Sequence, residues 1–303
     1  MEFNNISGSI PPNKIVNEHI KENNLSDLES LPEELIFELL FKSDENLLQV
    51  NKNLWNLKNK ITFKGNKAID EKIINFIESY IQINKPEEIN QERNSFISGI
   101  LKTIDKAALT SEQFERLIDL FISKKDCPSL SLIAQNPFYD REDLGIKMLF
   151  FAAEIGDAKL TSILAKDEMI NLAAEDNEAF VKAAENGHLF LLELLTEKTN
   201  PNTNNVDVAD QENAAIRAAS KNGHADVVRY LLTFEEVDPS AENNEALLEA
   251  VRAGHIEVVE ELIKDERVAA PDMLVFYQEA IAIARDEQKE DIFQLLLQNP
   301  NIS

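Results

Sequence analysis

The chain has 303 residues, of which 44% are hydrophobic and 28% charged, with 55 acidic against 30 basic side chains. This composition excludes a chain that is disordered throughout, and the formal net charge of −25 argues against nucleic acid and anionic membranes as partners, because both are bound through Lys and Arg. With only 7% aromatic residues, 8 glycines and 10 prolines, a β-sandwich or barrel with many tight turns is also disfavoured.

The acidic excess is uneven along the chain. Residues 1–100 carry 11 basic and 16 acidic groups, whereas residues 101–303 carry 19 and 39. We therefore expect different domains in the two parts, the second with an acidic surface. The single cysteine, Cys127, allows no intramolecular disulfide, and no apolar run reaches the roughly 18 residues of a membrane span. The first residues also lack the apolar core of a secretory signal peptide.

Residues 1–25 are polar and rich in Asn, which predicts a flexible arm. Residues 26–62 predict three short helices, the first opening at Leu31-Pro32 with two glutamates behind it. This segment resembles an F-box, a short helical motif that docks on the SKP-type adaptor of cullin–RING ubiquitin ligases. The resemblance implies apolar anchors on the adaptor at Leu31, Pro32, Leu35, Ile36 and Leu39, supported by Leu48, Val50 and Trp55.

The F-box pattern is not complete. The interval between Leu40 and Val50 is shorter than in the family, and Lys42-Ser43 stands where an apolar residue commonly closes the first helix. The same residues also suit an N-terminal helical cap without a ligase role. Residues 63–108 predict two amphipathic helices, 67–83 and 89–108, which we expect to form a helical bridge that covers the first repeat.

Residues 109–303 contain a repeated helix–turn–helix pattern. Three copies align at once, AFVKAAENGHLFLLELL (179–195), AIRAASKNGHADVVRYLL (215–232) and ALLEAVRAGHIEVVEELI (246–263). Weaker copies cover 117–133, 148–164 and 280–297, so that the turns fall at positions 125, 156, 187, 223, 254 and 288. Glycine at such a turn supplies a left-handed backbone, and small residues in the first helices let neighbouring repeats approach closely. Glu-Ala pairs at 178, 245 and 279 are expected to open three of the first helices.

This pattern resembles ankyrin repeats, through the Gly-His turn and the Val-Val-x-x-Leu-Leu stripe at 227–232. The fold expected is all-α, an ankyrin-repeat solenoid of about six degenerate repeats preceded by the F-box-like helical region. The family's Thr-Pro-Leu-His opening is absent, which leaves the regularity of the hairpin loops open, and 31-residue spacings suggest shortened hairpins.

Residues typical of catalysis or of cofactor and metal binding are not recognisable in the sequence. His188, His224 and His255 recur at one turn position, which favours a structural hydrogen bond over a metal or acid–base role. Cys127 lacks a local histidine base, and the phosphate-loop, dinucleotide, zinc-protease and serine-hydrolase motifs are absent. The sequence therefore predicts a non-enzyme with no cofactor.

The predicted function is protein binding on the first-helix face of the repeats. The candidate target-binding residues are polar and mixed in sign: Lys182, Glu185, Asn186, Arg217, Lys221, Asn222, Glu249 and Arg252. One hypothesis is an adaptor in which the F-box-like segment docks on the SKP-type protein and the repeats recruit an unknown host target. A second is a plain ankyrin scaffold, and a third is a small enzyme in residues 1–110.

An F-box joined to ankyrin repeats is similar to effectors that intracellular bacteria such as Legionella inject into host cells. That resemblance implies delivery by a bacterial translocation system into the host cytoplasm. Without such delivery, a cytoplasmic protein is expected.

Overall fold

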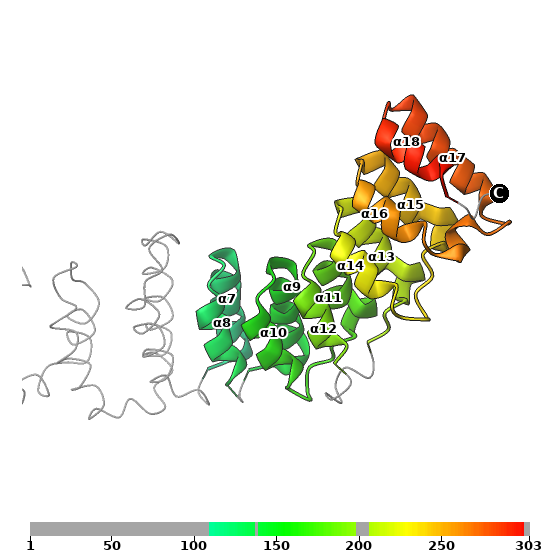
Figure 1. Ribbon diagram of the computed structural model, residues 1–303. Helices are drawn as coiled ribbons and strands as arrows, with labels where there is room; N and C mark the ends of the chain where they lie inside the picture. Colours follow the sequence, from blue (N-terminus) through cyan, green and yellow to red (C-terminus); the bar gives the residue numbers. More distant parts are fainter. Residues whose placement is uncertain (1–108, 137–138, 198–205, 300–303) are drawn as a thin grey trace, which may run out of the picture. The chain divides into compact units, whose positions relative to one another are not determined.

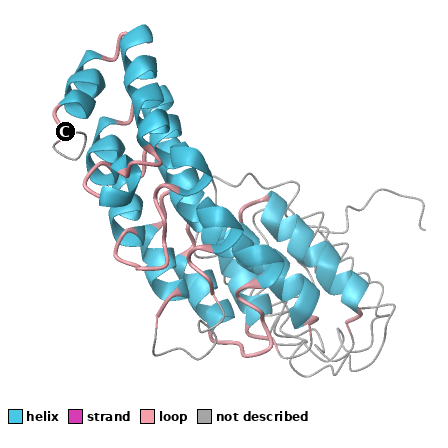
Figure 2. Cartoon of the chain, turned by 90° about the vertical axis from the view of Figure 1, so that its right-hand side faces the viewer, coloured by secondary structure: helices cyan, strands magenta, loops and turns pink. Residues whose placement is uncertain are grey.

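The computed structural model describes residues 109–136, 139–197 and 206–299. The predicted arm, the F-box-like helices and the bridge (1–25, 26–62 and 63–108) lie outside the described residues, as do the expected adaptor anchors from Leu31 to Trp55. Among the residues described, every regular element is a helix (Figure 2), so the all-α prediction is confirmed for this part of the chain.

The described helices follow one another as six antiparallel pairs (Figure 1). The pairs are α7 (Ser111–Ser123) with α8 (Cys127–Ala134), α9 (Ile146–Ile155) with α10 (Ala158–Ala165), α11 (Ala174–Glu185) with α12 (Leu189–Leu195), α13 (Asp210–Asn222) with α14 (Ala225–Leu231), α15 (Ala241–Ala253) with α16 (Ile256–Leu262), and α17 (Leu274–Asp286) with α18 (Glu290–Leu297). A π-helical turn, η3 (Arg141–Gly145), precedes α9, and a 3₁₀ turn, η5 (Glu266–Ala269), follows α16.

The pairs stack so that first helices contact first helices and second helices contact second helices. In the first layer, small buried residues such as Ala183, Ala184, Ala219 and Ala250 lie at the helix contacts. In the second layer the space is filled by larger side chains, all fully buried: Leu192, Leu195, Val227, Leu231, Val258 and Leu262. Each pair buries its apolar face against its neighbours, which is the stabilising logic of a solenoid.

All six predicted turns are found at the expected positions. Four of them hold glycine with positive φ, from +73° at Gly187 to +85° at Gly254. The two outer turns hold Lys125 (φ +53°) and Gln288 (φ +58°) instead. The left-handed residue ends the first helix of each pair, and the next residue is the N-cap of the second helix.

The turn histidines connect neighbouring repeats, as the structural interpretation predicted. The Nε2–H groups of His188, His224 and His255 donate to carbonyls at the end of the preceding first helix, those of Glu154 (3.2 Å), Glu185 (3.0 Å) and Lys221 (3.1 Å). In the last pair Lys289 takes this place and donates to the carbonyl of Val251 at 2.9 Å. These bonds satisfy carbonyls that a helix end leaves without intrahelical partners.

A second repeated feature, a left-handed turn at the start of a first helix, was not predicted from the sequence. Helices α11, α13 and α15 each open with three residues in the left-handed conformation, Glu175–Asn177, Gln211–Asn213 and Glu242–Asn244. The third residue is always a buried Asn whose side chain reaches the following repeat. Asn177 and Asn213 accept from the backbone N–H of Asp207 (3.0 Å) and Asp238 (2.8 Å). Asn244 donates to the carbonyl of Val268 at 2.9 Å.

These turns explain where the first helices begin. Glu178 and Glu245 follow the left-handed residues directly and open the right-handed part of their helices, as predicted. The same prediction for Glu279 is wrong, because α17 has no left-handed turn and extends back to Leu274, which places Glu279 inside the helix. The loops are therefore regular over three repeats despite the missing Thr-Pro-Leu-His motif.

Candidate protein-binding face

A groove of about 280 Å³ lies where α11, α13 and α15 present their outer sides. Its lining residues are Val181, Glu185, Ala214, Arg217, Ala218, Lys221, Asn222, Glu245 and Glu249. Five of the predicted target-binding residues are among them, namely Glu185, Arg217, Lys221, Asn222 and Glu249. The expectation that these five residues bind a target stays a prediction.

The hollow exists because α13 carries small residues on this side. Ala214 and Ala218 are four residues apart, and Lys221 follows three later, so all three share one face of the helix. The alanines leave room at the floor, while longer polar side chains from three helices form the walls. Sequence inspection missed Val181, Ala214, Ala218 and Glu245, although the i, i+4 spacing of the two alanines beside Arg217 and Lys221 was a usable signal.

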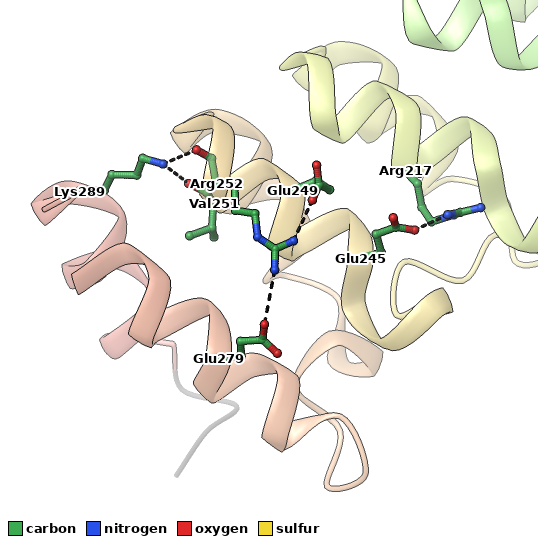
Figure 3. Close-up of polar contacts among 7 residues, drawn as sticks. All are labelled: Arg217, Glu245, Glu249, Val251, Arg252, Glu279 and Lys289. Carbon is green, nitrogen blue, oxygen red and sulfur yellow. Dashed lines mark hydrogen bonds and ion pairs between the residues drawn. The ribbon is translucent and has the colours of Figure 1, made fainter. Parts of the chain in front are cut away.

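Ion pairs hold the wall residues in place and link consecutive first helices (Figure 3). The guanidinium of Arg217 on α13 pairs with the carboxylate of Glu245 on α15 and also donates to the carbonyl of Gln211 at 3.0 Å. On α15, Arg252 pairs with Glu249 at 2.8 Å and with Glu279 of α17 at 3.4 Å. These pairs are partly exposed, so each adds little to stability, but together they fix side-chain positions along the face.

The other three predicted target-binding residues, Lys182, Asn186 and Arg252, lie outside the groove lining. Lys182 pairs with Glu178 at 3.1 Å on its own helix. Asn186 donates its side-chain amide to the carbonyl of Lys182 at 2.9 Å, at the end of α11. Asn222 repeats that contact with Ala218 at 3.0 Å on α13 while also lining the groove. Their contact with a target stays a prediction.

Two cations and three carboxylates line the groove. Some of them form ion pairs within the chain and others do not. Arg217 and Glu245 are paired with each other, and Glu249 is paired with Arg252. Within the described part of the chain, Lys221 and Glu185 make no ion pair, and both side chains are exposed. These two groups are therefore available to a bound molecule.

Burial shifts the pKa of two ionisable groups away from the groove. Burial raises the pKa of the Cys127 thiol to about 12, with the carboxylate of Asp157 acting in the same direction. Burial also raises the pKa of Tyr139 to about 12. A thiol that stays protonated near neutral pH is a poor nucleophile. Over the same residues, groups of His, Cys, Asp and Glu suited to hold a metal ion are not found.

Among residues 109–136, 139–197 and 206–299, none of the helices combines the length and apolar character that crossing a membrane requires.

A protein-family model matches the part of the chain that forms the groove. Residues 180–273 match the family model for ankyrin repeats, with three copies. Matches among curated proteins were not found for this chain. The matched range covers the second half of α11 and all of α12 to α16, and therefore every residue of the groove lining. Ankyrin repeats typically serve as non-catalytic scaffolds for protein–protein interaction. The match does not extend to residues 26–62.

Proposed function

We propose that this ankyrin-repeat protein is a scaffold that binds a partner protein in the groove between α11, α13 and α15. The observation that carries the proposal is the groove itself, a polar-walled hollow with a floor of small residues inside the matched repeats. Its volume of about 280 Å³ is at the lower end of what small-molecule and cofactor pockets enclose, and it suits one or a few side chains of a protein partner.

The surroundings of the groove support binding without large rearrangement. The Arg217–Glu245 pair spans two repeats across the groove, and the histidine and asparagine contacts tie each repeat to the next. A surface held in this way loses little conformational entropy when it binds, so a modest contact area is sufficient for specific recognition.

The test is a pulldown with the whole chain from eukaryotic lysate, comparing the unmodified protein with Ala218→Trp. Tryptophan at residue 218 fills the floor of the groove, so partners bound there are lost. The matched control is Glu193→Trp on α12, an exposed second-helix position. The proposal fails if Ala218→Trp, shown to be folded by circular dichroism, retains the same partners as the control.

We further propose that the N-terminal region couples this scaffold to ubiquitin ligation in a host cell. The support is the sequence pattern of Leu31-Pro32 followed by Leu35, Ile36 and Leu39, which resembles an F-box and lies outside the described residues. In this proposal the SKP-type adaptor binds residues 26–62, the repeats recruit the target, and the protein is delivered to the host cytoplasm by a bacterial translocation system.

The adaptor proposal is tested with purified SKP-type protein and the whole chain. Leu31→Ala combined with Pro32→Ala is expected to abolish binding while the helical circular dichroism is unchanged. Absence of binding by the unmodified chain, or binding that survives the double substitution, leaves the plain scaffold as the function.

A further inference from the structure

The side of the repeats that carries the groove is strongly acidic. In residues 174–186, 206–222 and 240–253, which span the opening turns and first helices of three repeats, ten carboxylates face four cations. The carboxylates belong to Glu175, Asp176, Glu178, Glu185, Asp207, Asp210, Glu212, Glu242, Glu245 and Glu249, and the cations to Lys182, Arg217, Lys221 and Arg252.

The cations on this side are mostly paired within the chain. Lys182 pairs with Glu178, Arg217 with Glu245, and Arg252 with Glu249 and Glu279. Within the described residues only Lys221 among these four cations makes no ion pair. Three of the four cations are therefore neutralised by three of the ten carboxylates, Glu178, Glu245 and Glu249. The seven other carboxylates outnumber the one unpaired cation, Lys221, which favours a partner of positive charge.

Two of the carboxylates repel each other between the opening turns of α13 and α15. Glu212 and Glu242 occupy the left-handed turns that open α13 and α15, and both are exposed. The pKa of Glu242 is raised by its hydrogen bond with Glu212 and by that group's charge, whereas the charge of Arg217, a groove residue, lowers it. Arg217 of the groove donates to the carbonyl of Gln211, next to Glu212, at 3.0 Å and pairs with Glu245, three residues after Glu242, so both turns are tied to a groove residue. A cation placed there relieves the repulsion.

We propose that the groove binds a basic segment of the partner protein. A small apolar residue of that segment lies on the floor at Ala214 and Ala218. Its Lys or Arg side chains lie toward the Glu212–Glu242 pair and toward Glu185. The inference rests on the proposed function, since it assigns a chemistry to the partner of the same groove.

A random-peptide display library selected against the whole chain tests the charge directly. We expect the enriched peptides to carry more Lys and Arg than Asp and Glu, and to lose binding to Ala218→Trp. If that variant does not fold, Ala218→Gln fills the floor less severely and takes its place.

Titration of an enriched basic peptide then locates the contacts. Glu212→Gln with Glu242→Gln is expected to weaken binding about tenfold, and Lys221→Glu to strengthen it about threefold. The matched control, Glu257→Gln with Glu260→Gln on α16, removes the same charge from exposed second-helix positions and is expected to change the Kd by less than about twofold.

The outcomes separate this inference from the proposed function. If the enriched peptides lack an excess of Lys and Arg but still lose binding to Ala218→Trp, the basic-partner inference is overturned. The groove then remains a binding site. An equal loss of affinity in the Glu212→Gln, Glu242→Gln variant and in the α16 control also overturns it, because the effect then comes from net charge alone. If the peptides bind Ala218→Trp as well as they bind the unmodified chain, or if no peptide is enriched, both proposals are overturned.

Discussion

The imidazole of His224 lies directly over Gly187 of the preceding repeat. A Cβ atom on residue 187 would come within 2.5 Å of Nδ1 of His224, closer than any van der Waals contact allows. Gly156 and Gly223 have the same relation to His188 and His255. Glycine is therefore needed at these turns for two reasons, the positive φ and the ring of the next repeat.

The first prediction compares Gly187 and Gly254, which both have positive φ. Only Gly187 lies beneath the ring of a histidine in the next repeat. Gly187→Ala is expected to lower the free energy of unfolding by about 3 kcal/mol, because backbone strain and the clash with His224 add. Gly254→Ala is expected to cost about 1 kcal/mol, since the nearest atom to its Cβ is Cε of Lys289 at 3.6 Å. Urea denaturation of both variants measures the difference.

A double substitution controls this comparison. In the His224→Ala background the ring is gone, so the cost of Gly187→Ala should fall to that of Gly254→Ala. Equal costs with and without the ring would show that backbone strain alone requires the glycine.

The second prediction concerns the buried asparagines. Asn213→Ala is expected to destabilise the repeats by about 2–3 kcal/mol, because alanine disfavours φ +64° and leaves the N–H of Asp238 without its acceptor. Asn243→Ala is the matched control, at φ +61° but exposed, and should cost only the backbone share. Comparable midpoints of thermal unfolding for the two variants would contradict the inter-repeat role.

The third prediction is a stabilising change. The Ser220 hydroxyl is fully buried and has no hydrogen-bond partner among the described residues, at a position where α11 carries Ala184. Ser220→Ala removes an unsatisfied polar group and is expected to raise the free energy of unfolding by about 0.5–1 kcal/mol. Differential scanning calorimetry measures it, and a lower melting temperature would indicate a partner for the hydroxyl.

The fourth prediction is a dependence on pH. The hydrogen bond from Arg267 lowers the pKa of Asp265, and Arg267 in turn donates to the carbonyl of Val237 in the preceding repeat at 2.8 Å. Because the folded pKa is depressed, this contribution is present above the unfolded pKa of about 3.9 and is lost as the pH falls through the folded value.

Asp265→Asn should therefore be less stable than the unmodified protein at pH 7, by about 1 kcal/mol or less, and equally stable near pH 2. Urea titrations across this range test it. A difference that persists unchanged at the lowest pH would assign the effect to packing.

The fifth prediction concerns Cys127. Burial raises the pKa of its thiol to about 12, so at pH 8 the folded protein should react with iodoacetamide far more slowly than the unfolded chain. Mass spectrometry of alkylated protein with and without urea measures the ratio. Rapid labelling of the folded chain would mean that the first pair opens readily.

The helix pairs were predictable because their signals are local. The turn positions, the small residues of the first helices and the large residues of the second helices all follow from periodicity. The left-handed turns were missed because three consecutive non-glycine residues with positive φ contradict local propensity, and only the contacts of Asn177, Asn213 and Asn244 with the next repeat make them stable. The start of α17 was misplaced because this helix has no such turn, so its Glu-Ala pair lies inside the helix and does not mark its beginning.

The recurrence and spacing of residues were therefore enough to predict a stack of paired helices after residue 108, and the composition was enough to predict its acidic surface. The tertiary structure decided which of the polar residues share a groove, which of them are already paired, and which asparagines and histidines join the repeats. Those properties depend on distances between different repeats, and such distances are set by the stacking of helices rather than by the order of residues within any one of them.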